Sequence, residues 1–359
     1  MNRFKHIIEK FYIIFVNILL TCLQASMKRL TIKDIAKEAG VSVGLVSMVL
    51  NSREGVNKNT ADHILEVVKR LNYTPNKAAS TLRIGHKNTI GVITPDISNH
   101  YFSEISRHIE NIAYSNGYTV LFGSSDDKPE KIGSLIETFY SDGVKGILIS
   151  PCDDSEPEIE RAISLGMSVV LMNRDLNGLE TVGRVILNNE KAISMAMDHL
   201  LENGCRHIEV ISNVVKISTL RTREQAYLNE MERRGMGSLS RITYLDESDR
   251  DELDASVRAA YERGADAFIV PRGYLALHVS NSIRRIGLRI PEDIALIGFD
   301  GGDTYRIMTP VISQMYQENR ETAYDAYTML CEMMYSNVPG SRIEIEPRIE
   351  MGGSSVRGK

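Results

Sequence analysis

Polar, charged and aromatic side chains follow several short apolar runs of this 359-residue sequence. The runs are typical of buried strands, and in open parallel sheets a ligand binds beyond the carboxyl ends of the strands. The candidate binding residues are Asn99, Tyr101, Phe102, Asp127, Asn173, Arg174, Arg223, Arg272 and Asp300. Rings stack on apolar faces, while carboxylates, amides and guanidinium groups hydrogen-bond to paired hydroxyls. These residue types predict a small polyhydroxylated or heterocyclic ligand. For Tyr101 and Phe102, packing beneath the first helix is an equal alternative.

The sequence lacks the motifs of familiar catalytic sites. It has no Walker phosphate loop, no G-x-G-x-x-G after its first apolar run, no G-x-S-x-G elbow and no H-E-x-x-H pair. Its four cysteines, Cys22, Cys152, Cys205 and Cys331, are scattered, without a close pair or a histidine at metal-ligand spacing. We therefore expect a binding protein in the reducing cytoplasm, without cofactor or metal, and not an enzyme.

Alternating periodicities predict the scaffold that positions these side chains. From Thr89, the apolar runs TIGVITP, YTVLFGS, GILIS and SVVLMN alternate with amphipathic segments near 102–116, 129–141 and 155–165. After Asn188, the runs HIEVIS, RITYLD, AFIVP and ALIGFD are separated by helical segments near 190–203, 221–234, 251–263 and 274–286. This βαβ pattern is typical of a parallel sheet covered by helices, and its repetition predicts two α/β lobes with a cleft between them.

A different kind of element is predicted in residues 31–51, TIKDIAKEAGVSVGLVSMVLN. One apolar stripe of a short helix is formed by Ile32, Ile35, Ala36 and Ala39. Thr31 caps this helix, with Asp34 at a capping-box spacing, and Gly40 ends it. Two short helices joined by a tight glycine turn form a helix-turn-helix, whose second helix enters the DNA major groove. An ordinary helical hairpin is the alternative.

The second and third helices complete this small unit. Ser42 caps the second helix, which turns Val46, Val49 and Leu50 toward the first helix and leaves Val43, Gly44, Ser47 and Met48 on its outer side. Residues 57–71 read as a third amphipathic helix that closes the core with Ile64, Leu65, Val68 and Leu71. Residues 72–76, NYTPN, then break the chain.

Charge is distributed so that DNA affinity belongs to the N-terminal part. Residues 27–85 contain ten Lys or Arg and five Asp or Glu, whereas the chain from residue 86 carries a net charge of −12. A net negative charge repels phosphate, and a basic excess attracts it. The basic excess stops near residue 85, which a merely solvated helix face does not explain.

The segments TIKDIAKEAGVS, VLN, LNYTPN and NKAASTLRIG resemble the DNA-binding headpiece and hinge of the lac and galactose repressor family of bacterial regulators. The similarity continues to about residue 350. It implies an α/β protein in which an all-α helix-turn-helix headpiece precedes a two-lobed, parallel-sheet core like periplasmic binding proteins. The domains it implies are a headpiece at 27–75, a hinge at 76–86 and a core at 87–350. Lobe one would take about 87–187 with 318–350, and lobe two about 188–317.

The resemblance also assigns site residues. The implied DNA contacts are Thr31, Lys33, Ser42, Val43, Gly44, Ser47, Met48, Asn51, Asn76, Ala79, Leu82 and Arg83. In the family the hinge folds on the operator and a leucine wedges into the minor groove; Leu82 is the matching residue, with a plain linker residue as the alternative. In LRIPEDIALIGFD, Asp300 matches the family's effector-binding aspartate, with a loop cap as the alternative, and Arg223 in RTREQAY matches its arginine.

Two departures from the family pattern shape the expected specificity. Arg272-Gly273 stands where the family usually has Asn-Asp after the eighth strand, which suggests an anionic effector such as a sugar phosphate or acid. The recognition helix carries Val43, Gly44, Leu45 and Met48, which offer no side-chain hydrogen bond to a base. Readout by apolar contact and DNA shape then predicts an A·T-rich operator. The chain also has no tryptophan, so any ring stacking falls to Tyr or Phe.

Residues 1–26 have the shape of a signal peptide or short anchor. Three basic residues precede an apolar run from Phe11 to Leu23, which is shorter than the roughly 20 residues that span a membrane. We expect Met27 to be the natural start and residues 1–26 to be an upstream extension. The alternative is a membrane-tethered solute receptor with a vestigial headpiece. The favoured prediction is a cytoplasmic homodimeric repressor that senses a sugar or sugar derivative and has no stable membrane association.

Overall fold

The computed structural model describes residues 30–50, 56–71, 73, 88–214, 217–246, 249–336 and 338–357. The chain divides into two units, residues 1–86 and residues 87–359. Each unit has its own hydrophobic core, one built from the helices before residue 72 and the others from the sheets that follow residue 88. The two units are therefore described separately.

The first unit contains the three short helices that the sequence predicts. Its helices are α2 (Ile32–Ala39), α3 (Val43–Leu50) and α4 (Lys58–Arg70). The carboxylate of Asp34 accepts hydrogen bonds from the backbone N–H of Thr31 at 2.7 Å and from its hydroxyl at 2.6 Å. Gly40 ends α2 with a left-handed φ of 64°. The hydroxyl of Ser42 accepts from the N–H of Leu45 at 3.2 Å and so caps α3.

The packing of these helices corrects two details of the sequence-based prediction. Ile35, Val46 and Ile64 are fully buried as expected, but Leu65 is 48% exposed and Val67 takes its place in the core. The prediction that Leu65 lies in the core was wrong because α4 turns this side chain toward solvent. Val43, predicted on the outer side of α3, is half-buried and packs against the same core because it lies in the first turn, close to α2.

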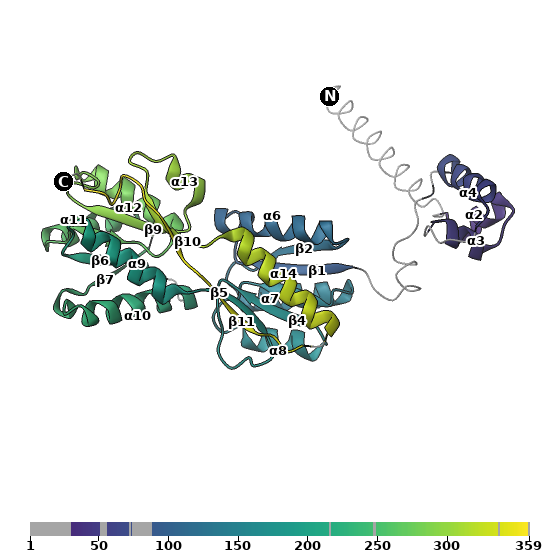
Figure 1. The fold of residues 1–359 in the computed structure, drawn as a ribbon, viewed down its shortest axis with the longest axis horizontal. Coiled ribbons are helices and arrows are strands. Elements are labelled where there is room, and N and C mark those ends of the chain that lie inside the picture. Colours follow the sequence, from purple (N-terminus) through teal and green to yellow (C-terminus); the bar gives the residue numbers. More distant parts are fainter. Residues whose placement is uncertain are drawn as a thin grey trace, which may run out of the picture. The chain divides into compact units, whose positions relative to one another are not determined.

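The second unit contains two α/β lobes (Figure 1). The first lobe consists of β1 (Thr89–Thr94), α6 (His100–Ser115), β2 (Thr119–Ser124), α7 (Pro129–Ser141), β3 (Gly146–Ile149), α8 (Glu156–Ser164), β4 (Ser168–Met172), β5 (Gly183–Leu187), α14 (Asn319–Ser336) and β11 (Arg342–Ile345). The second lobe consists of α9 (Asn189–Glu202), β6 (Ile208–Asn213), α10 (Ser218–Arg233), a 3-10 turn (Gly237–Leu239), β7 (Ile242–Leu245), α11 (Arg250–Glu262), β8 (Ala267–Ile269), α12 (Gly273–Arg285), β9 (Ala295–Phe299), α13 (Gly302–Arg306), β10 (Ser313–Tyr316) and β12 (Arg348–Glu350).

The two sheets share one topology. Their strand orders are β11-β5-β4-β3-β1-β2 and β12-β10-β9-β8-β6-β7, and the described neighbours pair in parallel except β12 with β10. In both sheets the order reverses beside the first strand, between β1 and β3 and between β6 and β8. Such switch points leave a crevice at the carboxyl ends of the strands, where ligands bind.

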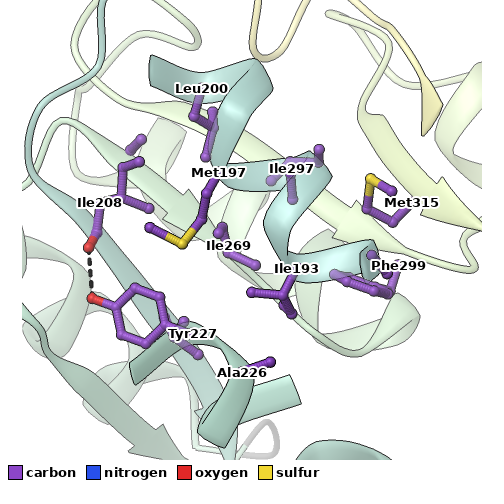
Figure 2. Close-up of a cluster of buried hydrophobic side chains, with 14 of the residues drawn as sticks. Ile193, Met197, Leu200, Ile208, Ala226, Tyr227, Ile269, Ile297, Phe299 and Met315 are labelled. Atoms are coloured by element: carbon purple, nitrogen blue, oxygen red, sulfur yellow. Dashed lines mark hydrogen bonds between the residues drawn. The ribbon is translucent and has the colours of Figure 1, made fainter. Parts of the chain in front are cut away.

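Helices cover both faces of each sheet. In the first lobe α6 and α14 bury one face and α7 and α8 the other; in the second lobe α9 and α10 oppose α11 and α12. Figure 2 shows the second-lobe core, in which Met197 and Tyr227 pack over the sheet residues Ile269 and Ile297. The Tyr227 hydroxyl donates to the Ile208 carbonyl at 2.8 Å, so this buried polar group is satisfied.

The C-terminal segment does not follow the predicted division, which gave 318–350 to the first lobe. β11 joins the first sheet beside β5, but β12 pairs with β10 of the second sheet. The predicted single strand is broken at Pro347, which cannot donate to a ladder. Residues beyond 350 also join the second lobe, because the backbone of Ser354 accepts from the N–H of Leu296 and donates to the carbonyl of Val311.

Three segments therefore cross between the lobes: β5 to α9, β10 to α14 and β11 to β12. The alternation of periodicities predicted the first, at about 188, and the family resemblance implied the second, at about 318. Among the helices of the described ranges, none is long and apolar enough to cross a membrane.

Candidate functional site

The predicted DNA-contacting residues of the first unit lie on α2, α3 and their turn. Thr31, Lys33, Ser42 and Gly44 are exposed, so their polar groups can meet a phosphate backbone. Ser47 and Met48 on α3 are partly exposed. The remaining predicted DNA contacts, Asn51, Asn76, Ala79, Leu82 and Arg83, lie outside the described residues.

A cleft of about 580 Å³ lies between the lobes of the second unit. All of the predicted effector residues line it: Asn99, Tyr101, Phe102, Asp127, Asn173, Arg174, Arg223, Arg272 and Asp300. They follow β1, β2, β4, β6, β8 and β9, because the carboxyl ends of the strands of both sheets open on the same crevice. The fold therefore brings together, in one cleft, side chains that lie far apart in the sequence, from Asn99 to Asp300.

Arg223 of α10 is the best-buried cation of the cleft, with 5% of its surface exposed. Its guanidinium donates to Asn189 Oδ1 at 2.7 Å, to the carbonyl of Pro271 at 2.6 Å and to Asp300 Oδ2 at 3.4 Å. The guanidinium carbon also lies 4.1 Å from the centroid of the Phe299 ring. These contacts fix the cation at the point where β8 and β9 end.

Burial and ion pairing have opposite effects on the pKa of each member of the Arg223–Asp300 pair. Burial raises the pKa of the Asp300 carboxyl, and the Arg223 charge and hydrogen bond pull that pKa back. Burial likewise lowers the pKa of Arg223, against the attraction of Asp300. Each charge therefore depends on the other, and Asp300 stays available as a hydrogen-bond acceptor facing the cleft.

The first lobe carries a second ion pair. Arg174 is 6% exposed, and its guanidinium donates to the Asp127 carboxylate and, at 3.2 Å, to the carbonyl of Pro151. Its Cζ lies 5.9 Å from the Phe102 ring centroid. Its Nε is buried and has no hydrogen-bond partner in the described structure. A buried donor without a partner is unfavourable.

The side chains of Tyr101 and Asn173 connect the cleft to Gln317, which lies in the segment that crosses from β10 to α14. Asn99 caps α6 by accepting from the N–H of Tyr101 at 3.0 Å. The Tyr101 hydroxyl accepts from Gln317 Nε2 at 2.8 Å, and the same nitrogen lies 3.5 Å from Asn173 Oδ1. Tyr101 and Phe102 are 7% and 6% exposed, so both pack into the lobe core as well as lining the cleft.

Three cleft residues have left-handed backbones although they are not glycine. Asp127, Asn173 and Asp300 have φ values of 54°, 64° and 49°. Aspartate and asparagine tolerate this conformation better than other side chains, and such residues concentrate at ligand sites. The geometry turns each side chain sharply at a strand end.

The Arg272-Gly273 departure has a steric explanation. Arg272 precedes α12 as its N-cap residue and is half-buried at the cleft wall. A Cβ on Gly273 would lie 2.8 Å from the carbonyl oxygen of Phe299 and 3.0 Å from that of Asp300. The carbonyl of Gly273 accepts from the Tyr305 hydroxyl at 2.7 Å. The close approach of α12 to β9 therefore requires glycine here.

Several cleft residues were not predicted from the sequence. They follow the same strands but are apolar or uncharged: Ile217, Thr219, Leu220, Tyr274, Leu277, Thr304 and Tyr305. Tyr274 is notable because 58% of its surface is exposed, which leaves its ring open for stacking. Its position directly after Arg272-Gly273, beyond the end of β8, was the sequence feature that could have indicated a cleft residue. Among the described residues, no group of three His, Cys, Asp or Glu is arranged to hold a metal.

Sequence models of two known domains match the chain in the same order. Residues 31–76 match the model described as bacterial regulatory proteins, lacI family, and residues 197–355 match a periplasmic binding protein-like domain. The first covers the helix-turn-helix, and the second covers most of the second lobe and the return to the first. They agree with a DNA-binding headpiece followed by a periplasmic-binding-protein-like core, of which the second model covers the later part.

Curated relatives share this organisation over most of their length. The ribose operon repressor of Halalkalibacterium halodurans is 29% identical over 289 residues, which are 80% of this chain and 85% of the relative. The transcriptional repressor PurR of Vibrio vulnificus is 26% identical over 89% of this chain and 96% of its own. Catabolite control protein A of Priestia megaterium is 27% identical over 90% and 99%.

Solved structures agree on the fold. The lac repressor dimer bound to operator and the anti-inducer ONPF superimposes with a TM-score of 0.81 at 20% identity, over 92% of this chain and 100% of that one. The complex of the transcriptional regulator CelR with cellobiose gives a TM-score of 0.65 at 21% identity, over 91% and 100%. These relatives are regulators and not enzymes, and they give no support to the solute-receptor alternative. The helix-turn-helix, the two-lobed core and these matches show that the chain belongs to the lacI family of bacterial transcriptional regulators.

Proposed function

We propose that this protein represses transcription as a homodimer, and that a small molecule in the inter-lobe cleft controls its affinity for operator DNA. The observation that carries this proposal is the cleft itself, in which charged, amide and aromatic side chains from both lobes converge. A ligand held by both lobes binds one lobe arrangement better than another and shifts the population toward it. The chain then acts in the cytoplasm, where its DNA is.

We infer that the effector is a sugar or a sugar phosphate. The cleft volume of about 580 Å³ suits such a molecule, since small-ligand pockets are typically about 300–1,000 Å³. Relatives support this class by name: one is a ribose operon repressor, and two solved relatives are complexes with cellobiose and with D-xylulofuranose. Carboxylate and guanidinium groups at the strand ends provide the paired acceptors and donors that hydroxyls need.

The phosphate or acid form of the effector is favoured by the position of Arg272, which lies at the cleft wall at the start of α12. A helix N-terminus favours an anion. Tyr274, which is exposed beside Arg272, is the ring that we assign to stacking on the effector.

Operator recognition is proposed to rest on phosphate positioning and apolar readout. Thr31, Lys33, Ser42 and Ser47 are assigned to phosphates, together with the backbone at Gly44. Because Val43 packs partly into the headpiece core, Met48 is the better candidate to meet thymine methyl groups. Leu82 is assigned to the minor-groove wedge, with Asn51, Asn76, Ala79 and Arg83 as accompanying contacts.

The effector assignment is tested by a thermal-shift screen of sugars and sugar phosphates, followed by calorimetry on the best ligand. Replacing the cation in Arg272→Asn should weaken a phosphorylated or acidic ligand about tenfold or more, while the matching neutral sugar changes little. Arg263→Asn, which removes an arginine of the second lobe that does not line the cleft, serves as the control. An unchanged preference between the two ligand forms rejects the anionic effector.

A further inference from the structure

An ion pair joins the two lobes beside the effector cleft. Arg221 lies on α10 of the second lobe, and Asp153 lies in the loop between β3 and α8 of the first lobe. The Arg221 guanidinium donates from Nη1 to Asp153 Oδ2, and from Nη2 to Asp153 Oδ1 at 3.1 Å. Leu220, the neighbour of Arg221, lines the cleft. The pair therefore lies at the rim of the cleft and outside its lining.

The pair is removed from the segments that connect the lobes. In the first sheet, the crossing strands β5 and β11 form one edge, and β4 separates β5 from β3, the strand before Asp153. A second contact between the lobes follows β4: the N–H of Asp175 donates to the hydroxyl of Ser218 on α10 at 3.1 Å. Opening of the cleft about the crossing segments moves α10 away from both loops. It must therefore break the ion pair and the Asp175 hydrogen bond together.

Arg221 faces more than one negative charge of the first lobe. Its hydrogen bond to Asp153 raises its pKa, and the charges of Asp153, Asp154 and Glu156 raise that pKa further, while burial lowers it. The side chains of Arg221 and Asp153 are 54% and 25% exposed. Water and ions therefore reach the pair, so added salt should weaken the attraction.

The strength of this pair suits a contact that opens and closes. A partly exposed ion pair changes an equilibrium by about 1.5- to fivefold, and a two-point contact between guanidinium and carboxylate is the stronger kind. Because the pair exists only while the lobes are together, its whole contribution favours the closed arrangement. A contribution of this size biases the cleft toward closure without preventing it from opening.

We propose that Arg221 and Asp153 form a latch that holds the cleft closed before a ligand enters and that must open for ligand entry and release. Breaking the latch raises the population of the open arrangement, and with it the rates of entry and release. This regulation rests on the proposed function in taking the cleft as the effector site. The latch itself is tested on ligand-free protein, so its failure leaves the effector proposal standing, and failure of the effector proposal leaves the result on the latch intact.

Hydrogen–deuterium exchange of the ligand-free full chain, read by mass spectrometry with fragmentation to single amides, tests the latch. The N–H of Asp175 is the reporter, because its acceptor, Ser218 Oγ, belongs to the other lobe. Exchange of this amide requires the lobes to part. Ser218→Ala removes the acceptor and sets the rate without the bond between the lobes. A wild-type rate equal to that of Ser218→Ala overturns the closed cleft.

Arg221→Gln removes the charge of the latch, and the Asp175 amide should then exchange about two- to fivefold faster than in the wild type. Raising NaCl from about 0.05 M to about 0.5 M should accelerate exchange in the wild type and have little effect in Arg221→Gln. Arg161→Gln is the matched control, because Arg161 is 57% exposed and pairs with Glu137 within the first lobe at 3.0 Å. Unchanged exchange in Arg221→Gln, or equal acceleration in Arg161→Gln, overturns the proposal.

A double-mutant cycle shows whether Arg221 acts through Asp153. Asp153→Asn alone should also accelerate exchange of the Asp175 amide. The double variant Arg221→Gln, Asp153→Asn should exchange no faster than Arg221→Gln alone, because the first change already removes the interaction. Fully additive effects would show that the two side chains act independently, which overturns the pair as the latch.

Discussion

At the scale of single residues, the Arg223–Asp300 pair is the centre of the cleft. Each side chain is held by hydrogen bonds from segments that follow different strands, so the pair connects the ends of β6, β8 and β9. Removing one member of a buried pair leaves the other charge without compensation, which is more damaging than never having the pair. The pair therefore supports both stability and ligand binding.

Asp300→Asn should lower the free energy of unfolding by roughly 1–3 kcal/mol, because Arg223 keeps its charge in a buried place without its carboxylate. The same change should abolish the thermal shift caused by the effector. Asp198→Asn, which removes the partly exposed partner of Arg234, should change the unfolding free energy by less than about 1 kcal/mol. Urea unfolding of the three proteins measures both values. Equal losses in the two variants would contradict the special role of Asp300.

His199 makes the second lobe sensitive to acid. Its ring is 7% exposed and hydrogen-bonds through Nε2 to the hydroxyl of Ser355 at 2.6 Å, and burial lowers its pKa. The folded state thus disfavours the protonated ring, whereas the unfolded chain takes up the proton near pH 6.5. The contribution of His199 to stability is complete above that pH and decreases as the pH falls below it.

His199→Gln should therefore flatten the loss of stability between about pH 7 and pH 5, as measured by urea unfolding across that range. His108→Gln, which changes a more exposed histidine on α6, is the control and should keep the acid-dependent loss. An unaltered slope in His199→Gln would show that the acid sensitivity lies elsewhere.

At the scale of secondary-structure elements, the first turn of α12 is set by its approach to the end of β9. The absence of a side chain at Gly273 lets the helix start beside the carbonyl oxygens of Phe299 and Asp300. That approach places Arg272 and Tyr274 at the cleft wall. A residue with a side chain at this position must move either the helix or the strand end that carries Asp300.

Gly273→Ala should reduce the free energy of unfolding by about 1–3 kcal/mol, since the contacts it would make are with backbone atoms that cannot rotate away. Effector affinity should fall with it. Gly133→Ala in α7 is the control, because its Cβ would meet only the flexible end of Glu158 and alanine favours a helix. Chemical unfolding and calorimetry measure the two effects; a Gly273→Ala protein as stable as the wild type would refute the steric account.

Most elements could be predicted from local patterns, and the exceptions have physical reasons. The helix predicted at 129–141 matches α7, and those predicted near 251–263 and 274–286 begin and end within one residue of α11 and α12. β10 was missed because Ser313 and Gln314 are polar yet buried, with partners in Ser354 and Glu350 near the end of the chain. Local periodicity carries no information about partners that lie so far along the sequence.

The candidate site was predicted better than its internal pairing. Strand-end position located the nine cleft residues, because the topology gathers all strand ends at one crevice. The pairing of Arg174 with Asp127 was not predictable, since it depends on how the loops after β2 and β4 fold within the first lobe. The role of Gln317 was not predictable because it depends on the path of the segment that crosses from β10 to α14. Tyr274 was not predicted because it lies in the first turn of α12, two residues beyond the charged residue Arg272.

At the scale of the whole molecule, a basic helix-turn-helix unit precedes an acidic core with a cleft between two lobes. The proposed regulation needs the core to present two headpieces to one stretch of DNA, with half-sites about one helical turn apart. The recognition helix offers mainly apolar side chains, so base identity must be sensed through methyl groups and DNA shape. The spacing of the two headpieces predicts the arrangement of the half-sites, and the apolar recognition helix predicts their base composition.

Selection of binding sites from a random double-stranded DNA pool with the full chain tests this account most directly. The account predicts enrichment of near-palindromic, A·T-rich sequences whose half-sites lie about one turn apart, with a strong preference at the central step. Enrichment of G-rich half-sites would contradict the apolar readout, and enrichment of no sequence at all would contradict operator binding itself.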